Sequence, residues 1–210
     1  MVYNSPRYIY PPRPKNAIPP SELGFYDNGS MIGQVKSNGS NCVIITNGDQ
    51  YTIMNRHNQY LTNFQLGEEI KSLYRGNGEW MIINGEYLNK NKSDETGSPF
   101  NHKLVIFDIL VYQNIYLVGR TVEERINLLY ELYGQVESEK EYLYKVSENI
   151  YMVKSYGDNF ENLFNKLTPI DLIEGFVIKR KNAKLENSGS ELNNQKWQIK
   201  CRKPTKNYKY

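Results

Sequence analysis

The stretch GQVKSNGSNCVII, residues 33–45, places a short polar tetrapeptide, residues 36–39, between two segments rich in apolar and β-branched residues. Such residues are typical of strands, so residues 31–35 and 41–46 are predicted to form β-strands. A lysine in a turn of this kind is most often a solvated side chain. The stretch alone therefore predicts strand, turn and strand, and leaves the role of Lys36 open.

Similar β-type runs follow along the chain at 51–55, 79–85, 103–112, 174–181 and 196–203. The turn sequences NGD at 47–49 and GNG at 76–78 are typical of hairpins, which predicts a mostly antiparallel arrangement. A polar loop at 182–195 joins the last two runs.

Two helices are predicted between these runs. The segment 121–134 has Thr121 as N-cap, glutamates in its first turn, apolar residues at 122, 126, 129 and 132, and a terminal Gly134. A shorter helix is predicted at 159–167, before a Thr-Pro pair. The predicted class is α+β, with mostly antiparallel sheets forming a cleft and helices on the outside.

The first 20 residues hold six of the nine prolines. Because proline has no backbone N–H, regular ladders are not expected there, and the segment is predicted to be an extended arm on the surface or across a cleft. We expect residues 1–20 to be this arm and residues 21–210 to form one domain.

Bulk composition sets broad limits. A chain of 210 residues with 39% hydrophobic content suits one soluble domain, and a net charge of +3 does not by itself require nucleic acid. The basic segment 179–209 favours an anionic partner. Two distant cysteines, Cys42 and Cys201, predict reduced thiols in the cytoplasm, and no apolar run is long enough to span a membrane. We expect a monomer.

Lys36 is followed by an ordered set of motifs, each on a predicted strand. They are NGEY with Glu86, IFDIL with Phe107, EGFVIKRK with Glu174 and Lys179, and WQIKCRK with Lys200 and Arg202. This order resembles the covalent nucleotidyltransferase superfamily of ATP-dependent DNA ligases, RNA ligases and mRNA capping guanylyltransferases. The resemblance covers residues 30–203 and implies an adenylation domain with a nucleotide-binding cleft.

The resemblance also implies roles for these side chains. Lys36 would be the nucleophile that forms a lysyl-nucleotide with ATP, Glu86 would hold the ribose, and Phe107 would stack on the purine. Glu174 would bind a catalytic Mg²⁺. The phosphates would be held by Lys179, Lys200 and Arg202.

An amine attacks phosphorus only when it is neutral, whereas a free lysine is almost wholly protonated at pH 7. Burial and the cations Lys179 and Lys200 are expected to favour the neutral form of Lys36. The same cations would balance the charge on the transferring phosphate.

The opening motif departs from the commonest family pattern. Most members have Lys-x-Asp-Gly and an arginine five residues after the lysine, whereas this chain has Asn38, Gly39 and Asn41. Asn41, five residues after the lysine, resembles the asparagine that the second family of RNA ligases has at this position. Gln34 would accept from the adenine amine, Asn38 would lie near the ribose, and Arg56 would lie on the ribose side.

The predicted function is an ATP-dependent polynucleotide ligase that seals 5′-phosphate and 3′-hydroxyl ends, with RNA ligase favoured over DNA ligase. The segment after Phe107 is equally similar to DNA ligases. No OB-fold or helical C-terminal domain is expected in this chain. The alternatives are a catalytically weakened module that binds nucleic-acid ends, a GTP-dependent guanylyltransferase, or an unrelated α+β domain.

Overall fold

The structure is a computed structural model that describes residues 6–134 and 140–204, and these residues form two sheets. The five-stranded sheet has the order β1 (Arg13–Ala17), β12 (Asn194–Arg202), β11 (Ile173–Arg180), β2 (Met31–Ser37) and β10 (Ser155–Tyr156). The seven-stranded sheet has the order β4 (Tyr51–Asn55), β3 (Ser40–Thr46), β5 (Met81–Leu88), β6 (Lys103–Tyr112), β9 (Ile150–Val153) and β8 (Leu143–Lys145), with β7 (Ile115–Tyr116) paired to β6.

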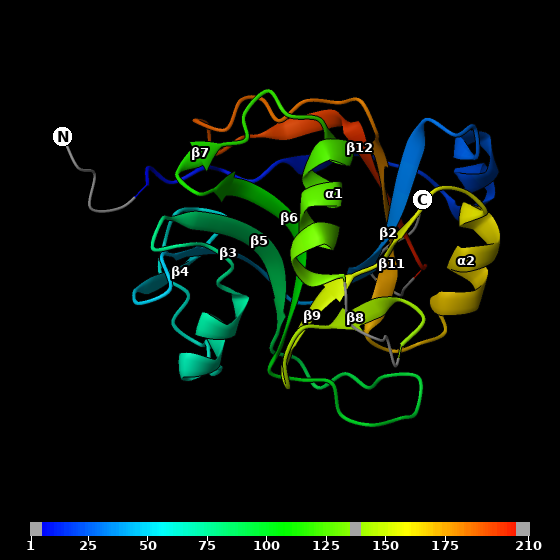
Figure 1. Ribbon diagram of the computed structural model, residues 1–210. Coiled ribbons are helices and arrows are strands. Elements are labelled where there is room, and N and C mark those ends of the chain that lie inside the picture. The colour runs from blue at the N-terminus through cyan, green and yellow to red at the C-terminus, as the bar shows by residue number, and fades with distance from the viewer. Residues whose placement is uncertain (1–5, 135–139, 205–210) are drawn as a thin grey trace.

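The helices are α1 (Val122–Tyr133), α2 (Phe160–Leu167) and two 3-10 helices, η1 (Pro20–Tyr26) and η2 (Gly67–Leu73). Figure 1 shows α2 on the outer side of β2 and β11, and α1 between the two sheets. Among the described strand pairs, only β1–β12 and β6–β9 are parallel. The predicted α+β class with mostly antiparallel sheets is confirmed.

Residues 36–39 connect the two sheets. β2 ends at Ser37 in the five-stranded sheet, and β3 begins at Ser40 in the seven-stranded sheet. The two predicted strands on either side of Lys36 therefore do not pair with each other. Both strands are present, and Lys36 lies within β2 rather than in the turn.

The two predicted hairpins have different outcomes. The NGD turn does join the antiparallel pair β3 and β4. The GNG sequence at 76–78 does not form a hairpin, because it follows η2 and leads into β5. Local turn chemistry indicates a change of direction, but it does not indicate whether a strand precedes the turn.

Helix α1 begins and ends as the sequence predicts. Thr121 and Glu124 form a complete capping box, in which each side chain bonds the backbone N–H of the other residue. On the inner side of the helix, Val122 and Ile126 pack in a cluster with Ile32 of β2. Farther along, Leu129 and Tyr133 join the core of the seven-stranded sheet. Thus α1 packs against both sheets, and Tyr133 is more deeply buried than Leu132, which packs against the same core.

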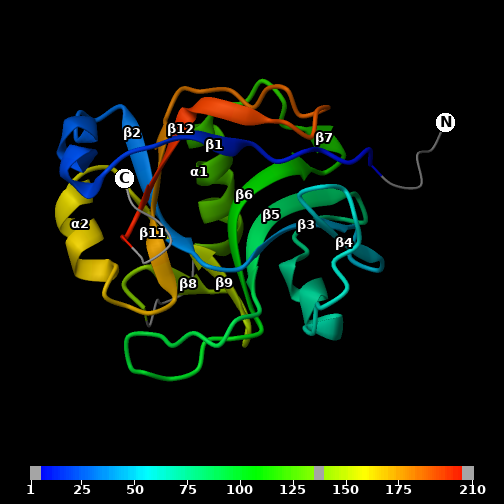
Figure 2. The same cartoon turned by 180° about the vertical axis from the view of Figure 1, so that it is seen from behind.

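The N-terminal arm does form a ladder, which corrects the sequence prediction for residues 13–17. β1 pairs in parallel with β12, with a register shift between Pro14 and Asn16. Proline is tolerated here because β1 is an edge strand, where one side of the backbone needs no partner. Pro20 then starts η1, a position where its missing N–H has no helical partner in any case. Figure 2 shows β1 beside β12 from behind.

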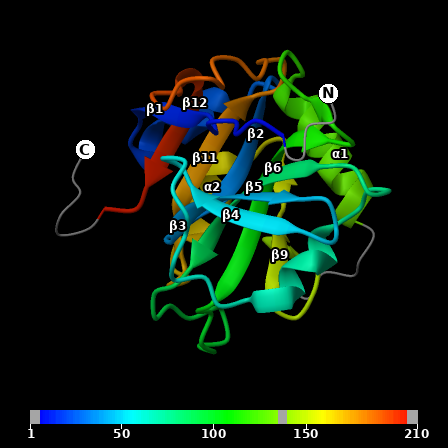
Figure 3. The same cartoon turned by 90° about the vertical axis from the view of Figure 1, so that its left-hand side faces the viewer.

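Three further observations concern the cysteines, the helices and the seven-stranded sheet. Cys42 and Cys201 are buried in different hydrophobic cores. Within residues 6–134 and 140–204, none of the helices combines the length and the apolar character needed to cross a membrane. Viewed from the side in Figure 3, β3 and β4 lie in front of the remaining strands of their sheet.

A buried ion pair joins α1 to β6. Arg125 donates from Nε to Asp108 Oδ1 at 2.9 Å and from Nη2 to Oδ2 at 3.1 Å, and both side chains are almost wholly buried. Arg125 also donates to the backbone carbonyl of Arg120. The bidentate geometry fixes the position of the helix against the strand that carries Phe107.

We expect Arg125→Leu to lower the free energy of unfolding by about 3 to 5 kcal/mol, because it leaves a buried carboxylate without its partner. The matched control is Arg120→Leu, which removes an exposed pair with Glu124 and should cost less than about 1 kcal/mol. Urea denaturation of the three proteins measures both values. Equal losses in the two variants would contradict this role of the buried pair.

Candidate functional site

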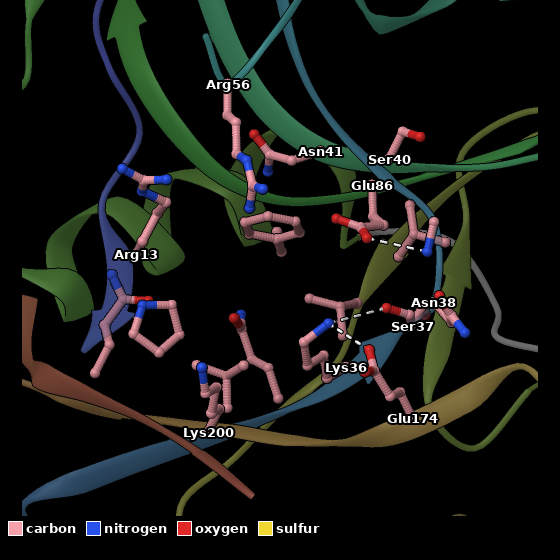
Figure 4. A pocket seen from close by; sticks show the side chains of 18 of the residues that line it. Arg13, Lys36, Ser37, Asn38, Ser40, Asn41, Arg56, Glu86, Glu174 and Lys200 are labelled. Atoms are coloured by element: carbon pink, nitrogen blue, oxygen red, sulfur yellow. Dashed lines mark hydrogen bonds and ion pairs between the residues drawn. The ribbon is translucent and has the colours of Figure 1, made fainter. Parts of the chain in front are cut away.

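A cleft of about 680 Å³ lies between the two sheets. Residues from β2, β3, β5, β6, β11 and β12 line it, together with part of the arm. Every candidate site residue from the sequence lines this cleft: Gln34, Lys36, Asn38, Gly39, Asn41, Arg56, Glu86, Phe107, Glu174, Lys179, Lys200 and Arg202. Figure 4 shows many of these side chains converging on one space. The fold thus brings all twelve together.

Lys36 is held in an ion pair by Glu174. The Lys36 Nζ lies 2.6 Å from Glu174 Oε2 (Figure 4). Arg202 Nε lies 2.9 Å from Oε1 of the same carboxylate. The three residues meet because Gly175 is paired with Lys36 on one side and with Arg202 on the other. The Glu174 carboxylate of β11 therefore joins two cations, one from the neighbouring strand β2 and one from β12.

An irregularity in β11 directs Glu174 into the cleft. Glu174, Val177 and Lys179 all line it, although a regular strand would place residues 174 and 177 on opposite faces. The pairing of β11 with β2 shifts register between Ile173 and Gly175, which changes the alternation at this point. A Cβ on Gly175 would lie 2.0 Å from the Cys201 carbonyl oxygen, so only glycine fits between these strands.

Glu86 caps the crossing between the sheets. The backbone N–H of Gly39 donates to Glu86 Oε1 at 3.0 Å. A Cβ on Gly39 would lie 2.3 Å from the carbonyl oxygen of Tyr87, so the turn can approach β5 only with glycine at this position. Burial raises the pKa of Glu86, while Lys36 and the Gly39 N–H oppose this shift.

Asn41 and Asn38 occupy the two positions where the opening motif departs from the family pattern. Asn41 Nδ2 donates to Asn84 Oδ1 at 3.0 Å and to the Gly85 carbonyl at 3.2 Å. Asn38 Oδ1 accepts from Lys90 Nζ at 2.9 Å. Both amides are therefore integrated into the local hydrogen bonding without adding charge to the cleft.

Phe107 and Lys179 face each other across the sheets. The Lys179 ammonium lies 5.2 Å from the centre of the Phe107 ring. Burial lowers the pKa of Lys179 to about 8, and Arg125 adds to this effect while Asp108 opposes it.

Lys200 and Gln34 complete the inner walls. Burial lowers the pKa of Lys200, the nearby Arg202 and Lys36 lower it further, and Glu174 opposes them. Gln34 is buried and its Nε2 donates to Ser155 Oγ at 2.9 Å. With the amide nitrogen engaged, the amide oxygen is the atom with which Gln34 can accept a hydrogen bond from a ligand.

The structure adds side chains that sequence reasoning missed. Pro12, Arg13 and Pro14 of the arm line the cleft, as does His57 after β4. His57 Nδ1 contacts a carboxylate oxygen of Glu191, which lies in the loop between β11 and β12. The arm was predicted to lie on the surface or across a cleft, but no local signal distinguished Arg13 from the other basic residues of the arm.

The charge of the cleft suits an anionic ligand. Arginine and lysine contribute six of its lining residues, whereas Glu86 and Glu174 are its two carboxylates. Within the described part of the chain, no group of three or more histidine, cysteine or acidic side chains could hold a metal ion. Glu174 alone fits Mg²⁺ that arrives with a polyphosphate, because such sites use one or two carboxylates and the phosphate oxygens.

Solved structures of ligases share this fold. Mycobacterial DNA ligase D complexed with ATP and MES aligns with a TM-score of 0.66 and 15% identity over 91% of this chain and 59% of that chain. The ligase domain from M. tuberculosis LigD aligns with a TM-score of 0.62 and 14% identity over 90% of this chain and 58% of that chain. This chain therefore spans less than two thirds of either protein.

A third structure is that of a Lig E DNA ligase, described as binding DNA with a minimal scaffold. It aligns with a TM-score of 0.53 and 12% identity, over 94% of this chain and 69% of that chain. No curated protein matches the sequence.

Two sheets with a cleft between them are the fold that this chain shares with these ligase structures. The model of the RNA ligase family matches residues 29–197. The chain belongs to the RNA ligase family.

The lowered pKa of Lys179 predicts a pH effect on stability. Between about pH 8 and 10.5 the unfolded chain holds a proton on this lysine that the folded chain has lost, so its contribution to the free energy of unfolding rises with pH. We expect the wild type to gain up to about 3 kcal/mol relative to Lys179→Met over this interval. Urea denaturation at pH 7, 8.5 and 10 tests this, and a difference that stays constant would refute it.

Proposed function

We propose that this protein is an ATP-dependent polynucleotide ligase in which Lys36 becomes covalently adenylated. The observation that carries the proposal is the position of Lys36: it lies at the crossing between the sheets, inside a cationic cleft, and is paired with Glu174. Membership of the RNA ligase family and the likeness to a ligase bound to ATP support it. Residues 21–210 would form the adenylation domain and residues 1–20 the arm.

In the first step, the neutral amine of Lys36 would attack the α-phosphorus of ATP. A P–N bond forms, the P–O bond to pyrophosphate breaks, and pyrophosphate leaves. The ion pair with Glu174 must open before this attack, because the lysine nitrogen has to lose a proton. Lys200 and Arg202 lie on β12, on the far side of β11 from Lys36, and would balance the charge of the phosphates.

In the later steps, a 5′-phosphate oxygen of the nucleic acid would attack the adenylyl phosphorus, which breaks the P–N bond and restores Lys36. The 3′-hydroxyl of the other strand then attacks that 5′-phosphate, and AMP leaves as the phosphodiester forms. Phe107 would stack on the adenine, Gln34 would accept from its amine, and Glu86 would hold the ribose. Asn38, Asn41 and Arg56 line the surrounding wall.

Mg²⁺ would be held by Glu174 and phosphate oxygens, and when bound it would stabilise the negative charge of the polyphosphate. For this, Glu174 would have to exchange its contacts with Lys36 and Arg202 for the cation. The same carboxylate would thus hold Lys36 in the resting protein and release it when the nucleotide arrives.

The first test is covalent labelling. Incubation with α-labelled ATP and Mg²⁺ should produce a labelled protein, and both Lys36→Ala and Lys36→Arg should reduce labelling to background, because neither side chain supplies a nucleophilic amine. Lys71→Ala, an exposed change in η2, should label like the wild type. Lack of any adduct with ATP, in a wild-type protein that binds it, would sink the enzymatic proposal.

A second candidate function is an inactive module that binds nucleic-acid ends. It is favoured by the uncharged Asn38 and Asn41, which stand where most family members have aspartate and arginine. This module would bind 5′-phosphorylated ends equally well in the wild type and Lys36→Ala, and neither protein would be labelled. Labelling by GTP in place of ATP would instead indicate a guanylyltransferase.

The RNA preference rests on Asn41 and on the family match. We expect faster sealing when the strand that carries the 3′-hydroxyl ends in ribonucleotides than when the nick is all DNA. The reason is that the 2′-hydroxyl is the group by which a protein distinguishes RNA from DNA at a given site. Matched nicked duplexes that differ by one 2′-hydroxyl at a time measure this. Equal or faster sealing of the all-DNA nick would reverse the assignment.

A further inference from the structure

The arm connects the two sheets at one end of the cleft. Ile9 is buried in a cluster with Val43 and Ile82 of the seven-stranded sheet. A few residues later, the Arg13 N–H donates to the Asn193 carbonyl at 2.9 Å, and β1 begins its pairing with β12. The arm is therefore anchored on both sides of Arg13, so this side chain has a defined place in the cleft wall.

Arg13 and Arg56 reach into the same part of the cleft from different walls, Arg13 from β1 and Arg56 from the turn after β4 (Figure 4). Arg13 Nη2 donates to the Glu191 carbonyl at 2.6 Å, and Arg56 Nε donates to His57 Nε2 at 3.2 Å. Within residues 6–134 and 140–204, neither guanidinium forms an ion pair with a carboxylate. Each has further N–H groups available to a ligand, since a guanidinium carries five.

This arrangement differs from the one around Lys36. There, Lys36 and Arg202 share the carboxylate of Glu174, so their charges are balanced within the protein. Arg13 and Arg56 share no such group. Two guanidinium groups that face the same space repel each other, and an anion between them relieves this repulsion. Phosphate suits this role, because its oxygens match the fork of a guanidinium as those of a carboxylate do.

We propose that Arg13, placed by the N-terminal arm, forms with Arg56 a second phosphate-binding subsite in the cleft, separate from the Lys36, Glu174 and Arg202 group. The inference rests on the proposed function for the identity of the ligands. The phosphate is either a β- or γ-phosphate of ATP or a backbone phosphate of the nucleic acid near its end. Both sources present a tetrahedral phosphate group with negatively charged oxygens to the two arginines.

The test compares Arg13→Gln with Lys15→Gln. Lys15 lies two residues away on β1, is exposed and does not line the cleft, so it makes the same change in charge outside the subsite. Direct binding of Mg-ATP, of AMP and of a nicked duplex with a 5′-phosphate is measured by titration. We expect Arg13→Gln to weaken either Mg-ATP or the duplex by about tenfold or more, and Lys15→Gln to leave both within about twofold.

The two sources give different results. If ATP supplies the phosphate, Arg13→Gln weakens Mg-ATP and leaves AMP unchanged. If the nucleic acid supplies it, affinity for the duplex falls and the slope of log K against log salt decreases by about one unit, as expected for one lost phosphate contact. Equal affinities of Arg13→Gln and Lys15→Gln for all three ligands would overturn the proposal.

A double-variant cycle tests whether Arg13 and Arg56 act on the same phosphate, and thermal unfolding separates binding from folding. If Arg13 and Arg56 hold one phosphate, Arg13→Gln and Arg56→Gln together should cost less affinity than the sum of the single changes. The midpoint of thermal unfolding identifies any variant that loses the arm, and in that case Arg13→Lys, which keeps the charge, replaces it in the cycle. Strict additivity would overturn the shared subsite.

The outcome also remains distinct from that of the proposed function. A wild type that is never labelled by ATP but loses phosphate binding in Arg13→Gln would refute the ligase chemistry and retain the subsite. Normal labelling and unchanged binding in Arg13→Gln would refute the subsite and retain the chemistry.

Discussion

The close approach of Gly39 to the backbone of β5 is the constraint on which the cleft depends. At this point the chain leaves the five-stranded sheet and enters the seven-stranded one, and a side chain at residue 39 would overlap the carbonyl of Tyr87. The crossing is therefore short, and it holds β2 of one sheet close to β3 of the other. The cleft lies between the two sheets beyond this point. Lys36, three residues before Gly39 in β2, is thereby placed in the cleft between the sheets. The Gly39 N–H bonded to Glu86 completes the same corner, so the position of the lysine and that of the facing carboxylate have a common cause.

Charge within the cleft follows from this geometry. Burying cations in a low-dielectric space is unfavourable unless a partner is near, and Glu174 is the partner shared by β2 and β12. Lys179, which lacks a close carboxylate contact of that kind, responds by a lowered pKa. The resting cleft is thus a set of cations held by few carboxylates. An incoming polyphosphate would replace internal pairing by pairing with the ligand, which is how a site prepared for an anion can be stable without one.

Two further sets of contacts fix the position of one sheet relative to the other around the cleft. Behind it, α1 packs on both sheets and is tied to β6 by the buried Asp108–Arg125 pair. At one end, the arm buries Ile9 against one sheet and pairs β1 with the other. A cleft between two sheets that were joined only at residues 37–40 would be free to vary in width, and these contacts limit that freedom. Residues far from the cleft therefore influence how its opposing side chains meet.

Local patterns were sufficient for much of this protein. Alternating apolar residues located most of the long strands, the Thr121 cap and terminal glycine bounded α1, and the motifs selected twelve of the residues that line the cleft. Short elements such as β1, β8 and η2 were not predicted, because a few residues carry too little periodicity to reveal a partner distant in sequence. The GNG turn likewise could not reveal what preceded it. Which strands pair, and that β2 and β3 lie in different sheets, was decided by tertiary packing. So was the entry of Arg13 into the cleft, since a proline-rich edge strand is stable only beside the β12 backbone that accepts it.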